Sequence, residues 1–259
     1  MIRALKQNWK IYLIEAWALG MFMVSACAFV IFLEHPDFKM SSLIPSPALR
    51  RAVIALGMGL TAVLLIYSKW GKKSGAHMNP AVTLANFQLN RIEPADAAWY
   101  IIAQCCGAAF FVFLFKWLAF HYISDAAVNY IVTVPGSQGV LVAFGAECGM
   151  SFLLFYVVLL VSNSSLAKYT GWFAGAMVFI YIALEAPLSG MSINPARSFG
   201  SALSANSWES FWIYILAPVG GMQLAAYSYR RKYFNAKGEC DSMQSFMSGK
   251  QHDNKVYTV

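Results

Sequence analysis

Two short stretches of this sequence decide its fold: SGAHMNPA at Ser74–Ala81 and SGMSINPA at Ser189–Ala196. They share Ser, Gly, Asn, Pro and Ala at the same places, so five of their eight positions are identical. Proline is favoured in the first turn of a helix, and asparagine is a favoured residue just before it. Each stretch therefore predicts the start of a helix, and their recurrence predicts an internal repeat.

The helices that begin at these motifs are expected to be short. The weakly apolar stretches that follow cover only residues 82–88 and 197–203, whereas a helix needs about 20 apolar residues to span a bilayer. The sequence also contains longer apolar blocks, which predict six membrane-spanning helices at residues 11–33, 48–68, 95–120, 140–162, 169–184 and 211–229. Each motif follows the second span of its half, and we expect a half-helix there that enters the membrane without crossing it.

Three spans per half is an odd number, so the second half is predicted to run through the membrane in the opposite sense. The two half-helices then meet near mid-membrane with their N-termini, each of which carries about half a positive charge. Their asparagine amides offer hydrogen-bond donors, and the extended Ser-Gly backbone before them offers carbonyl acceptors. Irregular backbone at this depth is tolerated where it lines a water-filled path.

Composition supports a membrane protein and excludes several other classes. Of the 259 residues, 59% are hydrophobic and 12% are charged, about half the charged fraction of a soluble domain. The net charge of +7 does not predict nucleic-acid binding, because the basic residues are scattered between spans. They concentrate on the side that holds both termini, which is therefore expected to be cytoplasmic. The five cysteines show no metal-ligand spacing and no nucleophile–base pair is evident, so we expect no metal, cofactor or enzyme activity.

The predicted organisation is one all-α integral membrane domain with polar ends. Residues 1–10 are expected to form a cytoplasmic N-terminus and residues 231–259 a cytoplasmic tail. The membrane domain covers residues 11–230, with inverted halves at about 11–121 and 139–230.

These features resemble the aquaporin, or major intrinsic protein, family. The matching stretches are SGAHMNPAVTL at Ser74–Leu84 and SGMSINPARSFGSA at Ser189–Ala202, together with Gln104. The resemblance covers about residues 10–230. It implies six transmembrane helices with two re-entrant half-helices, a passive channel for water in the cell membrane, and a homotetramer in which each protomer has its own pore.

The resemblance also implies roles for individual residues. Glu15 and Glu147, in the first span of each half, look like the carboxylates that hold the re-entrant loops. His77 matches a loop histidine, for which we favour a hydrogen-bonding role over filtering. Arg197 resembles the arginine of the outer selectivity filter, where a fixed positive charge repels cations. The motif residues that resemble the family's central pore are Asn79, Pro80, Ala81, Asn194, Pro195 and Ala196.

The predicted filter departs from that of water-selective members. Ile182 occupies the place where those members have a histidine, and Met191 is the filter residue in the second loop. The second span supplies either Met58 or Gly59, of which Met58 is preferred. Such a filter is unusually apolar, and isoleucine at this place resembles the plant vacuolar branch, which includes ammonia and urea conductors. Ser198 instead points toward water, so the solute range stays open.

Three alternatives compete with a water channel. The first is a facilitator mainly for glycerol, ammonia or urea with the same fold. The second is a structural or junctional membrane protein with low permeability. The third, a secondary active transporter, is disfavoured because few ionisable residues lie within the spans.

Overall fold

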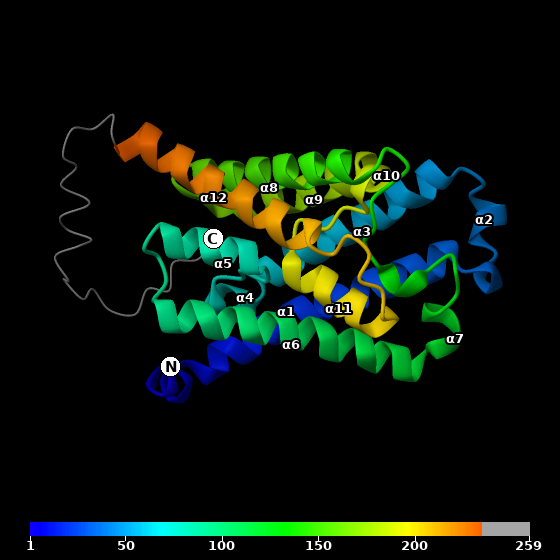
Figure 1. The fold of residues 1–259 in the computed structure, drawn as a ribbon, viewed down its shortest axis with the longest axis horizontal. Helices are drawn as coiled ribbons and strands as arrows, with labels where there is room; N and C mark the ends of the chain where they lie inside the picture. The colour runs from blue at the N-terminus through cyan, green and yellow to red at the C-terminus, as the bar shows by residue number, and fades with distance from the viewer. Residues whose placement is uncertain (235–259) are drawn as a thin grey trace.

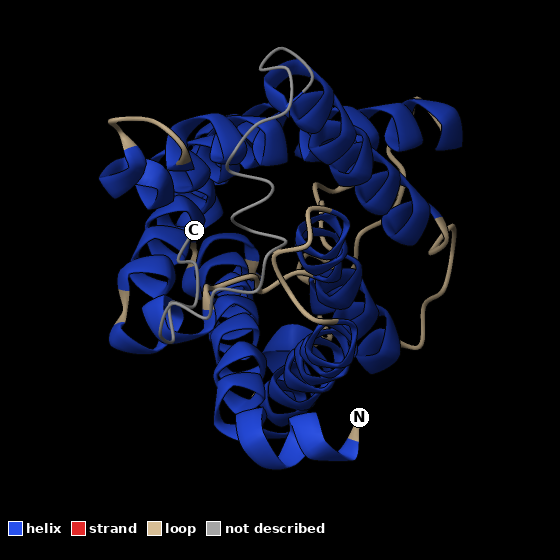
Figure 2. Ribbon diagram, turned by 90° about the vertical axis from the view of Figure 1, so that its left-hand side faces the viewer, coloured by secondary structure: helices blue, strands red, loops and turns tan. Residues whose placement is uncertain are grey.

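The computed structural model describes residues 1–234, and in that range the chain forms helices without any strand (Figures 1 and 2). The long and re-entrant helices are α1 (Ile2–Glu34), α3 (Pro47–Tyr67), α5 (Pro80–Gln88), α6 (Pro94–Leu118), α8 (Val140–Ser162), α9 (Thr170–Leu184), α11 (Pro195–Ala205) and α12 (Ile213–Phe234). The short connecting helices are η1 (Pro36–Phe38), α2 (Met40–Leu43), α4 (Lys69–Ser74), α7 (Phe120–Ile123), η2 (Asn129–Ile131), η3 (Ala167–Tyr169) and α10 (Ala186–Ser189).

The predicted architecture of six spanning helices and two half-helices is confirmed. Five helices of the described chain are long and apolar enough to cross a membrane by composition alone: α1, α3, α6, α8 and α9 with η3. The sixth, α12, has a similar length of 22 residues. It is less apolar because it contains Pro218, Gln223 and a basic end at Arg230–Lys232.

The helix ends differ from the predicted ones where polar residues continue a helix. Helix α1 begins at Ile2, nine residues before its apolar block, so the expected N-terminal segment 1–10 is mostly helical. Helix α12 runs to Phe234 and includes the first residues of the expected tail. Lysine and arginine are good helix formers, so a helix does not have to stop where its apolar stretch stops. The rest of the predicted tail, residues 235–259, lies outside the described residues.

The two halves pack in the same way. In each half the first and third long helices form an extensive contact, α1 with α6 and α8 with α12. Both contacts depend on a glycine, because a Cβ on Gly107 would lie 2.2 Å from the Ala16 carbonyl oxygen and one on Gly221 would lie 2.2 Å from that of Cys148. The second helices, α3 and α9, join the halves to one another.

The half-helices cross over between the halves. Helix α5 belongs to the first half but packs on α12, and α11 belongs to the second half but packs on α6. Figure 1 shows α5 and α11 between an upper group with α8, α9 and α12 and a lower group with α1 and α6. This exchange brings the two repeated motifs into the middle of the molecule.

Candidate functional site

Both motifs form capped helix starts, as their residue types favour. The Asn79 side-chain oxygen accepts from the Ala81 N–H at 2.8 Å, and Pro80 opens α5. In the second half the Asn194 oxygen accepts from the N–H groups of Ala196 at 3.1 Å and Arg197 at 3.3 Å, and Pro195 opens α11. An Asn-Pro pair favours this geometry because the proline needs no donor partner and the asparagine satisfies the next free N–H groups.

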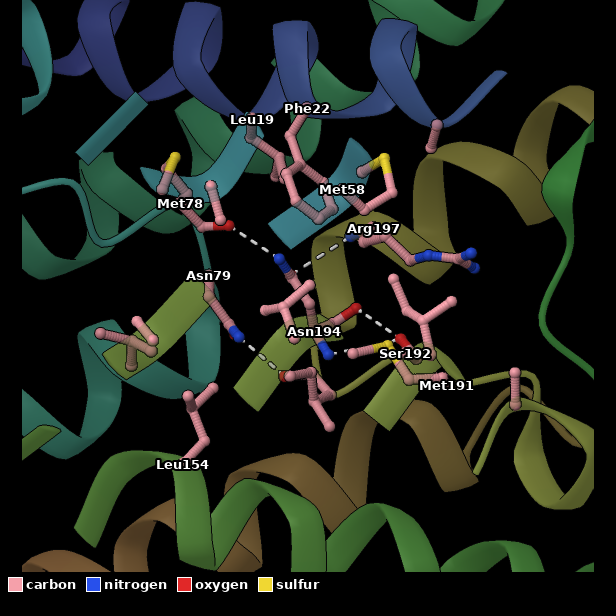
Figure 3. A pocket seen from close by; sticks show the side chains of 18 of the residues that line it. Leu19, Phe22, Met58, Met78, Asn79, Leu154, Met191, Ser192, Asn194 and Arg197 are labelled. Atoms are coloured by element: carbon pink, nitrogen blue, oxygen red, sulfur yellow. Dashed lines mark hydrogen bonds between the residues drawn. The ribbon is translucent and has the colours of Figure 1, made fainter. Parts of the chain in front are cut away.

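The two asparagines also bind the opposite loops. The Asn79 Nδ2 donates to the Ile193 carbonyl at 2.7 Å, and the Asn194 Nδ2 donates to the Met78 carbonyl at 2.7 Å. Figure 3 shows both hydrogen bonds, with the two amides approaching from opposite sides. The reciprocal pair fixes the distance between the half-helix N-termini, which therefore face one shared space.

The loops before the asparagines repeat the same unusual backbone. Three corresponding positions in each loop have positive φ angles, namely Gly75 (83°), Ala76 (48°) and Met78 (47°), and Gly190 (80°), Met191 (49°) and Ile193 (49°). Non-glycine residues in this region cost about 1–3 kcal/mol each. Such a loop persists only when the surrounding structure stabilises it. In this protein one buried carboxylate stabilises each loop.

The first of these carboxylates is Glu15, which is fully buried in α1. Its Oε1 accepts from the Ser74 hydroxyl at 2.7 Å and from the His77 N–H at 3.1 Å. Its Oε2 accepts from the Met78 N–H at 2.7 Å and from the Gln104 amide at 2.8 Å. One side chain thus satisfies two backbone donors of the first loop.

Glu147 does the same for the second loop from α8, where it is also fully buried. Its Oε1 accepts from the Ser189 hydroxyl at 2.6 Å and from the Ser192 N–H at 2.7 Å. Its Oε2 accepts from the Ile193 N–H at 2.6 Å. The matching bonds in both halves show that the glutamates and the motif serines act as one unit.

Two tyrosines complete the loop supports, and sequence reasoning assigned this role to neither. The Tyr100 hydroxyl donates to the Ser74 carbonyl at 2.7 Å, and the Tyr214 hydroxyl donates to the Ser189 carbonyl at 2.7 Å. The signal was available, because each tyrosine follows its motif serine at nearly the same separation, 26 and 25 residues. Comparing the third spans of the two halves would have found the pair.

A cavity of about 290 Å³ lies between the loops and the spanning helices. Asn79 and Asn194 line it, so both helix N-termini reach the same space. The expected filter residues that also line it are Met58, Ile182, Met191 and Arg197. Side chains that sequence reasoning did not single out, including Phe22, Leu154 and Val178, make most of the remaining wall apolar.

Gly59, the other filter candidate in the second span, lies elsewhere. A Cβ added there would come within 2.7 Å of the Gly175 carbonyl oxygen. Gly59 therefore allows α3 to pack closely on α9, whereas its neighbour Met58 lines the cavity.

Basic and polar side chains lie at particular points of the wall. Arg197 has a buried Nη1 without a hydrogen-bond partner among the described residues. Arg51, which the sequence analysis did not single out, also lines the cavity and donates to the Ala183 carbonyl at 3.0 Å. His77 lines the cavity too, with its Nδ1 3.1 Å from the Thr83 hydroxyl. The cavity thus combines an apolar wall with a few fixed donors.

One titratable group just outside the spans has an unusual environment. Burial raises the pKa of Glu185, the residue after the end of α9, to about 7. Burial therefore keeps its carboxyl group in the neutral form up to a higher pH than that of an exposed glutamate. Sequence reasoning did not identify this residue, because nothing local distinguishes a buried from an exposed glutamate at a helix end.

Comparison with known proteins identifies the class to which this fold and cavity belong. The sequence profile described as "Major intrinsic protein" matches residues 2–229. The chain therefore belongs to the major intrinsic protein family, whose members are membrane channels rather than enzymes.

Individual relatives include both water-channel and solute-facilitator names. The chain is 32% identical to Nodulin-26 of Glycine max, with 76% of this chain and 72% of that protein covered. It is 30% identical to Aquaporin NIP1-2 of Arabidopsis thaliana, covering 71% of this chain but only 64% of the relative. It is 35% identical to Glycerol uptake facilitator protein-like 6 of Lactiplantibacillus plantarum, covering 68% and 83%.

A solved structure supports the fold independently. The X-ray structure of the aquaglyceroporin from Plasmodium falciparum superposes with a TM-score of 0.73 at 19% identity, covering 89% of this chain and 98% of that one. At this identity the likeness concerns the fold alone.

Proposed function

We propose that the chain is a passive channel that passes water, and small neutral solutes with it, while excluding ions and protons. The observation that carries the proposal is the pair of asparagine-capped helix N-termini at one shared cavity. An asparagine amide has two N–H groups. One from each residue binds the opposite loop, and the other serves a passing solute oxygen.

Ion exclusion follows from the charges around the cavity. Two helix N-termini with about half a positive charge each face the path. The guanidinium groups of Arg51 and Arg197 add fixed positive charge at its wall. A cation that enters the cavity would lose part of its hydration shell, and the apolar wall offers few ligands to replace it. It would also be repelled by these positive charges. Hydronium is subject to the same repulsion.

The filter composition favours a solute range beyond water as the second candidate function. Met58, Ile182 and Met191 supply apolar surface, and Arg197 supplies the donors. Methionine is flexible, so the opening adapts to solutes of different shape. Water can still form hydrogen bonds with Arg197 and the loop carbonyls. Ammonia, urea or glycerol should meet a lower barrier here than in a filter with a histidine at the position of Ile182. The relative named as a glycerol uptake facilitator is consistent with this range.

The surface supports placement in a bilayer. Large apolar side chains are exposed on several spanning helices, such as Leu64 (72%), Phe113 (62%) and Leu141 (85%). Lipid or neighbouring protomers cover such surface in a membrane protein. We propose the cell membrane, with both termini cytoplasmic by the positive-inside rule, and a homotetramer with one pore per protomer. Cross-linking of the reconstituted protein tests the tetramer.

The proposed function is tested by measuring fluxes of water, glycerol, ammonia and urea into liposomes by stopped-flow, together with proton and ion leak. Ala174 lines the cavity from α9, so Ala174→Trp fills the path and should abolish every flux that the channel carries. Ala176→Trp is the matched control, because Ala176 is exposed on the same helix and a tryptophan there faces outward.

Two results would contradict the proposal. One is a sizeable ionic current with water flux at the level of empty liposomes. The other is equal fluxes in Ala174→Trp and Ala176→Trp, which would show that solutes do not use this cavity. Flux of all four solutes at background would instead favour a structural membrane protein.

A further inference from the structure

We propose that His35, Asp37 and His121 form a binding site for a divalent transition-metal ion of the zinc type. His35 directly follows α1, Asp37 lies in η1, and His121 lies in α7. In Figure 1 the elements α2 and α7 lie at the end of the molecule opposite the N-terminus. The site is separate from the cavity, and the proposal does not depend on the channel function.

The spacing of the three side chains suits a four-coordinate ion. The His121 Nε2 lies 3.4 Å from the Asp37 Oδ2, and the His35 Nδ1 lies 3.9 Å from the same oxygen. One ligand atom from each residue lies within 4.8 Å of the others. Zinc bonds of about 2.0–2.2 Å in a tetrahedron place the ligand atoms about 3.4 Å apart. One pair already has this separation, and rotation of the exposed Asp37 and His121 side chains brings the other ligand atoms closer.

His35 has a carboxylate near each of its two ring nitrogens. Its side chain is only 3% exposed, and its Nδ1 accepts from the Asp37 N–H at 3.2 Å. Nε2 is therefore the nitrogen that can donate, and it is a buried atom without a hydrogen-bond partner among the described residues. This nitrogen lies 4.0 Å from the Asp125 Oδ2. Histidine ligands commonly donate their second ring N–H to a carboxylate, and Asp125 is placed for this role once the metal takes the Nδ1 lone pair.

The donor set determines the kind of ion. Two imidazoles and one carboxylate suit zinc and its neighbours, whereas magnesium and calcium prefer oxygen ligands alone. The side chains of Asp37 and His121 are 56% and 76% exposed, so an ion reaches the site from solvent and water completes the coordination. The Asp37 N–H that loses its partner is at the surface, where water replaces it. The bound ion would connect the segment after α1 to the segment after α6.

The test is calorimetric titration of Zn²⁺ into the purified full chain after treatment with a chelator. We expect saturation at one ion per chain. His121→Ala and Asp37→Asn remove ligands at exposed positions and should weaken binding at least tenfold, and Asp125→Asn should weaken it about tenfold through the lost partner of His35. Mg²⁺ and Ca²⁺ should not compete. His252→Ala, which changes a histidine outside the described residues, is the control and should bind as the parent does.

Circular dichroism and thermal unfolding of each variant show that it is folded, so loss of binding is not confused with loss of structure. No saturable binding by the parent chain would overturn the proposal. So would unchanged affinity in both His121→Ala and Asp37→Asn, or loss of binding in His252→Ala alone.

Discussion

Replacing Glu147 with glutamine tests how strongly the second loop depends on its carboxylate. The side chain keeps its shape, but one of its two acceptor oxygens becomes an NH₂ group. If that group faces the backbone N–H of Ser192, now 2.7 Å from Oε1, two donors oppose one another. If it faces the N–H of Ile193, now 2.6 Å from Oε2, the same happens there. The Ser189 hydroxyl can turn to accept, but a backbone N–H cannot.

The cost follows from this count. One buried N–H without an acceptor costs about 1–3 kcal/mol, and the two remaining hydrogen bonds each lose about 1 kcal/mol because the acceptor is no longer charged. The total of about 3–5 kcal/mol is large beside a typical stability of about 5–15 kcal/mol. The loop already carries positive φ angles at Met191 and Ile193, so we expect it to shift and take Asn194 and Arg197 away from the cavity.

The measurements are stopped-flow water flux in liposomes and thermal unfolding in detergent. Glu147→Gln should lose most of its flux and unfold at a clearly lower temperature. The matched control is Ser151→Ala, one turn further along α8, because Ser151 is fully buried and its hydroxyl has no hydrogen-bond partner among the described residues. It should keep parental flux and stability. Parental behaviour of Glu147→Gln would refute the argument that the carboxylate holds the loop.

Three further predictions concern the cavity wall and its packing. Gly59→Ala should lower the thermal stability, because the new Cβ lies 2.7 Å from the Gly175 carbonyl oxygen. Gly145→Ala is the control and should not lower it, because a Cβ there meets nothing within 4 Å. Equal melting temperatures of the two variants would contradict this packing role. Met191→Cys should make water flux sensitive to mercurials, since a thiolate binds mercury far better than a thioether; a parent chain blocked as strongly as the variant would contradict the placement of Met191. Ile182→His should reduce ammonia or urea flux more than water flux, with each tenfold change equal to about 1.4 kcal/mol of barrier; equal effects on all solutes would show that Ile182 does not control selectivity.

The spanning helices could be predicted because their signal is local. A bilayer requires about 20 apolar residues in one stretch, and each predicted block contains most of an observed helix. The ends were less predictable. Helix α1 continues over exposed polar residues to Ile2, since helix propensity, not hydrophobicity, decides how far a helix extends into water.

The candidate site was predictable only where the repeat marked it. Asn79 and Asn194 stand in matching motifs, and Glu15 and Glu147 in matching spans. Tyr100 and Tyr214 have an equally symmetric role, but each lies in the third span of its half, outside the repeated motif. The metal-site residues His35 and His121 lie in separate connections and have no repeat or spacing to join them.

By itself the sequence determined the family, the helical class, the inverted repeat and the two capped half-helices. These features depend on residues that are close together in the chain: the length of each apolar stretch, the fixed φ angle of proline and the capping side-chain oxygen of asparagine. Only the tertiary structure decided which neighbour, Met58 or Gly59, lines the cavity, because a single residue turns a helical side chain by about 100°. The structure alone also showed the exchange by which α5 packs on α12 and α11 on α6, since that contact depends on the close approach of segments far apart in the chain.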